Sequence, residues 1–309
     1  MAPSGLSLGF FAYQAGAAHP IDDLFPGEPD HPDLRHLKTL GLRDFRRMDG
    51  PLFPALAEAA GRTLESARIG PESVDAILFF TSTFDFYRDH DQISVLASRL
   101  GLSRALPFGC FLSQCTNFSQ ALQVARGLLS EGGFRAILIL GGDRLDESRA
   151  SRVLPSRSSV FSDAVVSCLA GASPAGQYRL DGISHVYRPA MHGIDPRSDV
   201  LRYLQHFSQG YADALEGLYR ATGTGPDAYA RVALGNHNLS VLRNIAAIGR
   251  FPMARVFASN LPSYAHCFAA DQFVALADLA RDGASRPGDR ILVAGSGGYV
   301  FSACGFTRH

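Results

Sequence analysis

The fold prediction rests on the stretch Leu112-Ser-Gln-Cys-Thr-Asn-Phe118 and on the segment that follows it, Ser119-Gln-Ala-Leu-Gln-Val-Ala-Arg-Gly-Leu-Leu-Ser130. A short apolar run, Pro107 to Leu112, precedes the stretch, and the apolar residues of 119–130 recur at helical spacing. The pattern predicts a strand that turns into an amphipathic helix at Cys115. Free backbone N–H groups and the positive end of the helix dipole favour a thiolate at such a place. Cys115 is therefore a candidate nucleophile, and a small buried cysteine that only packs is the alternative.

Strand and helix patterns alternate along the rest of the chain. Buried-strand patterns occur at 6–13, 74–80, 136–140, 160–169, 231–234, 254–258 and 290–294, and helical spacing occurs at 52–67, 92–100, 201–222, 239–248 and 268–281. This alternation predicts parallel β-α-β connections, and residues 19–34 read as a loop. The strands at Ile77 and Ile137 are about 60 positions apart, as are those at Val232 and Ile291, which indicates an internal duplication.

Composition limits the functions that remain. The chain has 309 residues, 46% of them hydrophobic, and a formal net charge of zero, which fits a globular protein and argues against the clustered basic face of a nucleic-acid-binding protein. Five cysteines without a C-x-x-C pair favour neither a disulfide framework nor a zinc cage, so a reducing cytoplasm fits best. The N-terminal segment lacks the basic residues of a secretory signal, and no apolar run is long enough to span a membrane. We expect no metal and no cofactor.

Short motifs along the chain resemble those of the β-ketoacyl-acyl-carrier-protein synthase III family of the thiolase superfamily. They occur in the family's order: Cys115-Thr-Asn-Phe118 at the Cys-Ser/Ala-Gly-Phe nucleophile turn, Gly141-Gly-Asp-Arg-Leu145, Phe161-Ser-Asp-Ala164, Val232-Ala-Leu-Gly-Asn-His237 and Gly295-Ser-Gly-Gly-Tyr299. The resemblance covers nearly the whole chain. It implies a thiolase-like α/β fold in which two duplicated βαβαβ halves form a layered αβαβα body. We expect residues 1–174 to carry the nucleophile and residues 175–309 to carry two histidines and the glycine loop.

The resemblance also implies roles for the site residues. Cys115 would accept the acyl group from a thioester, and its N–H together with that of Gly297 would form the oxyanion hole. His237 would be the second catalytic group. His266, in Tyr264-Ala-His-Cys-Phe-Ala-Ala270, stands where the family has Asn, which gives a Cys-His-His set like that of elongating ketosynthases. This set is compatible with decarboxylative condensation and also with a general base for an oxygen or nitrogen nucleophile; packing at a helix start is the alternative for His266.

Binding residues follow from the resemblance in the same way. Thr81, Phe84 and Phe86 lie where family members line the acyl channel or the dimer seam, with ordinary core packing as the alternative. The family's coenzyme A clamp is altered, because its aromatic position is Arg35 and its arginine position is Thr39. This change favours an acyl carrier protein over free coenzyme A as the donor.

Two further arginines are candidates for the carrier contact. Arg243 and Arg250 follow His237 on a predicted helix, where a carrier's acidic helix would dock, although a solvated face explains them equally well.

The sequence as a whole predicts a cytoplasmic, homodimeric, synthase III-like acyltransferase. Asn117, Ser162 and His266 depart from the family's pattern, which favours a specialised pathway such as polyketide assembly over fatty acid synthesis. Carbon–carbon condensation ranks slightly ahead of acyl transfer to a hydroxyl or amine. A non-catalytic partner subunit of another ketosynthase is the remaining alternative, against which the retention of Cys115 and His237 argues.

Overall fold

A ten-stranded mixed sheet is the frame of the molecule. The computed structural model describes residues 5–85, 89–148, 150–172 and 176–309, and among these residues the strand order is β10-β9-β11-β12-β8-β1-β7-β6-β4-β5. The first half of the chain contributes β1 (Ser7–Ala15), β4 (Ala76–Phe80), β5 (Leu106–Cys110), β6 (Ala136–Asp143) and β7 (Ala164–Gly171). The second half contributes β8 (Tyr178–Tyr187), β9 (Arg231–Leu234), β10 (Val256–Phe257), β11 (Arg290–Gly297) and β12 (Val300–Arg308).

The strand order repeats itself on the two sides of the β1–β8 contact. Outward from that contact it runs β1-β7-β6-β4-β5 on one side and β8-β12-β11-β9-β10 on the other. The orientations repeat as well: β4 is parallel to β5 and β6, as β9 is to β10 and β11, whereas β7 and β12 are antiparallel to both of their neighbours. The predicted parallel β-α-β connections are thus present in each half, and antiparallel strands join them in a mixed sheet. The division into 1–174 and 175–309 stays a proposal, and its boundary falls in residues 173–175, outside the described residues.

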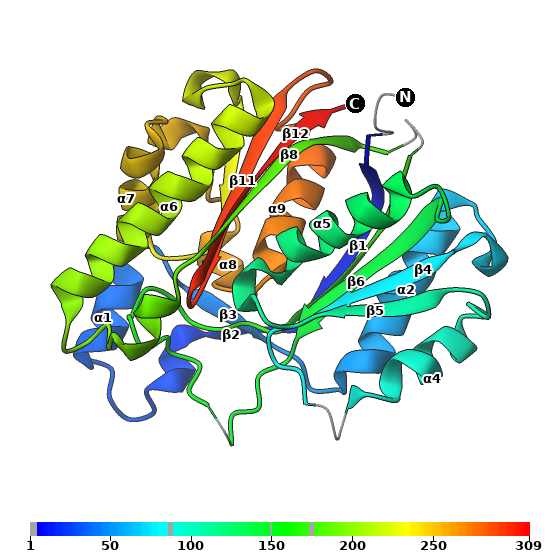
Figure 1. Cartoon of the computed structure of the whole chain (residues 1–309). Helices are drawn as coiled ribbons and strands as arrows, with labels where there is room; N and C mark the ends of the chain where they lie inside the picture. Colours follow the sequence, from blue (N-terminus) through cyan, green and yellow to red (C-terminus); the bar gives the residue numbers. More distant parts are fainter. Residues whose placement is uncertain (1–4, 86–88, 149, 173–175) are drawn as a thin grey trace.

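Helices cover the outer sides of the sheet, and two helices lie between its first-half strands and its second-half strands. On the outer side of the first half lie α2 (Leu52–Ala67) and α4 (Gln92–Arg99), and on the outer side of the second half lie α6 (Val200–Thr222) and α7 (Leu239–Gly249). In the middle, α5 (Asn117–Ser130) and α9 (Ala270–Arg281) contact each other and strands of both halves (Figure 1).

Side chains of the central strands alternate between two hydrophobic clusters. In β4, Leu78 faces the central cluster around α5 and α9, whereas its neighbour Phe79 faces the cluster under α2. In β11, Val293 faces the central cluster and Leu292 faces the cluster under α6 and α7. Strands buried on both faces read as continuous apolar runs, which is why the sequence revealed them. The αβαβα layering that the sequence predicts is confirmed.

Short elements occur in the segments that connect the main strands and helices. The segment predicted as a loop, 19–34, contains the end of β2 (Ala17–Pro20) and the start of α1 (Pro32–Thr39), and β2 pairs with β3 (Asp44–Arg47) in a separate ribbon. The helix α8 (Leu261–Tyr264) precedes α9. Within the part of the chain that the structure describes, no helix is both long and apolar enough to cross a membrane.

Candidate active site

Cys115 lies in a short turn between β5 and α5. A single 3-10 turn, Gln114–Thr116, leads directly into α5, which begins at Asn117. The Cys115 side chain is partly exposed, whereas the four other cysteines are buried. Gln114 has φ +47°, in the left-handed region that residues other than glycine rarely adopt. The predicted strand-to-helix placement of the thiol is thus what the structure shows.

His266 connects Cys115 to a buried carboxylate. Its Nε2 lies 3.2 Å from Sγ of Cys115, and its Nδ1 lies 2.5 Å from Oδ2 of Asp271. Asp271 is held in turn, because Oδ2 accepts the N–H of Asn236 at 2.6 Å and Oδ1 accepts the N–H of Cys267 at 2.7 Å. The three side chains form a Cys–His–Asp arrangement in which the carboxylate orients the imidazole toward the sulfur.

Sequence reasoning missed Asp271. It lies in the first turn of α9, among apolar residues that made the segment read as a plain buried helix. An acidic residue on the buried face of a predicted helix, five positions after a candidate catalytic histidine, was the available signal.

The protonation of His266 follows from its neighbours. Burial alone would lower the pKa of His266, but the negative charges of Asp271 and of the Cys115 sulfur raise it well above its usual value. The raised pKa favours the imidazolium form of His266, in which the two ring nitrogens can donate to Cys115 and to Asp271.

His237 lies beside His266 in the opposite electrostatic state. The two ring centroids are 4.9 Å apart, and Nδ1 of His237 is 3.2 Å from Oγ of Ser158. Burial and the neighbouring His266 lower the pKa of His237 to about 3, so this ring is neutral at physiological pH. One imidazole of the pair is thus charged and the other is neutral.

Cys115, His237 and His266 border the same cavity, whose volume is about 480 Å³. The structure therefore brings the three predicted catalytic residues together. One wall is apolar and comes from the segment 189–207 with its neighbours, and it includes Leu154, Met191, Ile194, Tyr203, Leu204 and Phe207. Hydroxyl and amide groups lie elsewhere on the lining, among them Ser156, Ser158, Asn244 and Ser296. An acyl chain with a polar end fits these surroundings.

Gly297 lies against the nucleophile turn at the end of β11. A Cβ added to it would come within 2.8 Å of the Cys115 nitrogen and nearer still to the carbonyl oxygen of Ser113. Only glycine permits so close an approach of the two main chains. The placement suits the oxyanion role predicted for the N–H groups of Gly297 and Cys115, and that role stays a prediction.

The role of Thr81, Phe84 and Phe86 at the acyl channel or the dimer seam stays a prediction. Thr81 donates its hydroxyl hydrogen bond to Asp143 at 2.8 Å, and Phe84 stacks on Phe111 with centroids 4.1 Å apart. Among the described residues, neither Thr81 nor Phe84 lines the cavity that holds Cys115, because both side chains are committed to contacts on the first-half side of the nucleophile turn. Phe86 lies outside the described residues.

The three arginines predicted to contact the carrier lie on the surface. The guanidinium of Arg35 lies 4.0 Å from Oδ1 of Asp30, and that of Arg250 lies 4.0 Å from Oε1 of Glu216. Arg243 is exposed on α7, the helix whose Asn244 borders the cavity. None of the three arginines is among the described residues that line the cavity, so any role would be in docking outside it.

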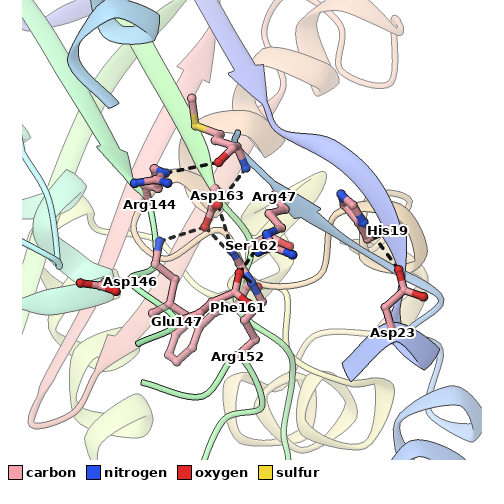
Figure 2. Close-up of polar contacts among 12 residues, drawn as sticks. His19, Asp23, Arg47, Arg144, Asp146, Glu147, Arg152, Phe161, Ser162 and Asp163 are labelled. Atoms are coloured by element: carbon pink, nitrogen blue, oxygen red, sulfur yellow. Dashed lines mark hydrogen bonds and ion pairs between the residues drawn. The ribbon is translucent and has the colours of Figure 1, made fainter. Parts of the chain in front are cut away.

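A buried ion pair supports the backbone next to His266. Arg152 and Asp163 form two hydrogen bonds of 3.0 Å, and Asp163 also accepts the N–H groups of Met48 and Leu145 (Figure 2). The segment they fix pairs with His266, whose N–H donates to Val160 at 2.9 Å and whose carbonyl accepts from Ser162 at 2.8 Å. The ion pair thus helps to hold the main chain that carries the imidazole of His266.

Comparisons with known proteins agree with this arrangement. A family model described as 3-oxoacyl-[acyl-carrier-protein] synthase III, C terminal, matches residues 219–308. The β-ketoacyl-[acyl-carrier-protein] synthase III of Prochlorococcus marinus is 28% identical over 291 residues, which cover 82% of this chain and 81% of that protein. The corresponding synthase of Fusobacterium nucleatum is 24% identical over 285 residues, covering 83% of each chain.

Solved structures show the same fold over nearly the whole chain. The acyltransferase ChlB3 superposes with a TM-score of 0.86 at 18% identity and covers 98% of each chain. The 3-oxoacyl-(acyl carrier protein) synthase III of Pseudomonas aeruginosa superposes with a TM-score of 0.80 at 21% identity, again over 98% of each chain. The synthase III of Aquifex aeolicus gives 0.79 at 18% identity, covering 98% of this chain and 100% of that one.

The chain has a thiolase-like α/β fold. In sequence the chain is similar to the 3-oxoacyl-acyl-carrier-protein synthase III enzymes, and it is a divergent, synthase III-like transferase. The family resemblance inferred from the motifs is confirmed.

Proposed function

We propose that this enzyme takes an acyl group from a carrier-bound thioester onto Cys115 and transfers it to a hydroxyl or amine acceptor. The observation that carries this proposal is the position of His266, which contacts Cys115 with one ring nitrogen and Asp271 with the other. A carboxylate behind the imidazole stabilises the imidazolium that forms when a hydroxyl or amine gives up its proton. The acyltransferase ChlB3, with the same fold, is in keeping with this chemistry.

In the first half-reaction, Cys115 attacks the carbonyl carbon of the donor thioester. His266 holds the thiol proton at Nε2 while the Sγ–carbon bond forms, and the N–H groups of Cys115 and Gly297 stabilise the oxyanion. The donor's carbon–sulfur bond then breaks, and His266 returns the proton to the departing thiolate. The acyl group remains on Cys115 as a thioester.

In the second half-reaction, the acceptor replaces the donor in the same cavity. Nε2 of His266 takes the acceptor's proton as the oxygen or nitrogen attacks the acyl carbon, and Asp271 holds the charged ring in place. The Sγ–carbon bond breaks, and the proton passes from His266 to the sulfur. This step restores the free enzyme and releases an ester or amide.

Decarboxylative condensation is the second candidate. The observation that favours it is the neutral ring of His237 beside the charged ring of His266, since two imidazoles bordering one cavity can polarise a malonyl carbonyl and stabilise the enolate left by carbon dioxide. The sequence ranked condensation slightly ahead. The Asp271 contact leads us to place acyl transfer to a hydroxyl or amine first.

Intact-protein mass spectrometry tests the first half-reaction. Incubation with acyl carrier thioesters is expected to add one acyl group to the wild type and none to Cys115→Ala. Subsequent addition of hydroxyl or amine acceptors should release the acyl group as an ester or amide without carbon dioxide. Release of carbon dioxide with a β-ketoacyl product from a malonyl carrier would establish condensation instead, and the absence of any adduct across several donors would leave the non-catalytic partner reading.

The proposal also covers the acyl donor, the oligomeric state, and the compartment and pathway of the enzyme. We propose an acyl carrier protein as the donor, since the coenzyme A clamp is altered at Arg35 and Thr39. Two exposed arginines also favour a carrier: Arg243 is next to Asn244, which borders the cavity, and Arg250 is at the end of the same helix. A homodimer is supported by the edge strand β5, where Leu106 is exposed, and by the neighbouring Leu112, which is 92% exposed. A cytoplasmic enzyme of a natural-product pathway remains our prediction.

A further inference from the structure

The side chain of Asn117 holds the nucleophile turn with both ends of its amide. Its Oδ1 accepts a hydrogen bond from the N–H of Ser113 at 2.9 Å, and its Nδ2 donates one to the carbonyl of Thr81 at 2.8 Å. Asn117 is fully buried in the first turn of α5. A glycine, which the synthase III motif has at this place, could make neither bond. The chain therefore has a tie that the family's motif lacks.

Thr81 is a firm anchor for this tie, because a buried carboxylate pins the segment 81–83. Oδ1 of Asp143 accepts the hydroxyl of Thr81 at 2.8 Å and the N–H groups of Ser82 and Thr83 at 2.6 Å and 2.9 Å. Asp143 is the last residue of β6, and Thr81 directly follows β4. Asn117 thus fastens the nucleophile turn to the ends of two central strands.

The turn requires such a tie because its backbone is strained. Gln114, immediately before Cys115, adopts φ +47°, which persists only where the surroundings impose it. Ser113, on the other side of Gln114, is held at both of its backbone groups: Asn117 binds its N–H, and the hydroxyl of Thr116 donates to its carbonyl at 2.7 Å. Gly297 packs against the same turn from the opposite side. Fixing Ser113 therefore fixes the direction of the peptide N–H and the thiol of Cys115.

We propose that Asn117 is the positioning residue of this active site, which sets the geometry of Cys115 for acylation by holding Ser113 to the end of β4. The inference rests on the proposed function, because it assigns Asn117 a part in the first half-reaction. Asn117 does not touch the substrate and acts only through the turn. A small displacement of a nucleophile or of an oxyanion donor from the reacting atom slows the chemical step more than it weakens substrate binding.

The first test compares Asn117→Gly with Thr63→Ala. Thr63 is equally buried, lies on α2 and donates to the carbonyl of Ser167 at 3.2 Å, away from the cavity. In single-turnover acylation followed by mass spectrometry, Asn117→Gly should react about 10²-fold more slowly than the wild type, with a half-saturating donor concentration changed by less than about threefold. Thr63→Ala should acylate at the wild-type rate at a similar loss of melting temperature.

Two results would each overturn one of the two proposals, the positioning role of Asn117 or the proposed function. An Asn117→Gly rate equal to that of Thr63→Ala overturns the positioning role while leaving the proposed function intact. A wild type that forms no adduct with any donor overturns the proposed function itself. The two failures are therefore distinguishable.

Asn117→Asp gives a readout that a mere packing role does not move. A protonated carboxyl offers one acceptor and one donor, as the amide does, whereas an ionised carboxylate offers only acceptors and faces the carbonyl of Thr81. The ratio of Asn117→Asp to wild-type acylation rates, measured at the same pH, should be high in mild acid and should fall as the pH rises. An Asn117→Asp variant that is as slow as Asn117→Gly at the lowest pH at which the wild type reacts overturns the role.

Discussion

At the scale of single residues, two buried imidazoles 4.9 Å apart respond to their surroundings in opposite directions. His266 has negative groups on both sides, so its pKa rises despite burial, whereas His237 has a hydroxyl on one side and the positive His266 on the other, so its pKa falls. Pairs of titratable groups whose environments separate their pKa values are typical of catalytic sites. Each of the two shifts leads to an experiment.

Asp271→Asn should disable His266 without removing it. The amide of Asn can donate to Nδ1, which favours the tautomer whose proton lies on Nε2, and that nitrogen can no longer accept the thiol or acceptor proton. We expect kcat to fall by about 10²–10⁴-fold in steady-state acyl transfer. Asp278→Asn is the matched control, since Asp278 is a buried acid on the same helix that binds Tyr13 and Asn260 away from the cavity. Equal losses in the two variants would contradict the role of Asp271.

His237 should make stability fall as the solution becomes more acidic. The unfolded chain protonates this histidine near 6.5, whereas the folded chain does so only near its lowered pKa of about 3, so the unfolded state binds more protons between these values. Stability from His237 is therefore present above pH 6.5 and is lost as the pH falls. His266 acts in the opposite sense, and because its pKa is raised, its contribution changes above pH 6.5.

Urea unfolding at pH 6.5 and at about pH 5 isolates this effect. The wild type should lose more free energy of unfolding between the two conditions than His237→Gln, by up to about 2 kcal/mol. The other titrating groups are common to both proteins and cancel in the difference. The same loss in both proteins would mean that His237 is not held neutral in the folded state.

The candidate site residues that lie within a recognisable motif were predictable from the sequence. Cys115, His237 and His266 each belong to a stretch with a recognisable order of residues, and the structure brings all three to one cavity. Asp271 was not predictable in this way, because it belongs to none of these motifs and is linked to the site only by its hydrogen bond with His266. The contact of Thr81 was not predictable, because the direction of a side chain after a strand depends on its hydrogen-bond acceptor, here Asp143.

At the scale of elements, the end of β11 and the start of α5 approach as closely as glycine allows. Gly297→Ala should push the Cys115 turn away, since the new Cβ would meet the Cys115 nitrogen at 2.8 Å. We expect a loss of about 10²–10³-fold in the acylation rate, the effect of losing one oxyanion donor. Gly61→Ala on α2, where a Cβ meets nothing within 4 Å, should leave the rate unchanged. A Gly297→Ala enzyme that acylates normally would rule out the oxyanion assignment.

Breaking the buried ion pair Arg152–Asp163 should lower the free energy of unfolding more than breaking an exposed ion pair does. Arg152→Met leaves the Asp163 carboxylate in the interior with only backbone donors, so we expect unfolding in urea to become easier by about 3–5 kcal/mol. Arg179→Met, which breaks a half-exposed pair with Asp181, should cost about 1 kcal/mol or less. Similar costs for the two substitutions would mean that water reaches the Arg152 site.

Strands were predictable from the sequence where both of their faces are buried. β4, β6 and β11 read as continuous apolar runs and were found, and α2 was predicted with the bounds that the structure gives it. β8 and β12 were missed because each is interrupted by polar residues and by Gly182 or Gly305, so neither a continuous nor a cleanly alternating pattern remains. The antiparallel pairing of these two strands therefore comes in addition to the parallel connections that the sequence predicts.

At the scale of the whole molecule, the three hydrophobic clusters divide unequally between the halves. The cluster under α2 comes from the first half alone, whereas the central cluster joins α5 and the strands of the first half to α9 and the strands of the second. A core shared in this way couples the two repeats of the strand order. Neither repeat can lose its structure without exposing the inner face of the other.

This coupling predicts that the two halves unfold together. Phe273 of α9 is fully buried and packs on Phe118 of α5 and Phe11 of β1, with ring centroids 5.7 Å and 4.9 Å away, so Phe273→Ala should cost about 3–5 kcal/mol. Phe53→Ala, in the cluster under α2, should shift the same single transition, because unfolding of the first half removes the packing surface of α9. Urea unfolding followed by circular dichroism, and by hydrogen exchange of peptides from β4 and β11, should therefore give one midpoint for each variant. Two transitions, of which Phe53→Ala moves only one, would show instead that the duplicated halves are independent folding units and that the central helices dock between finished domains.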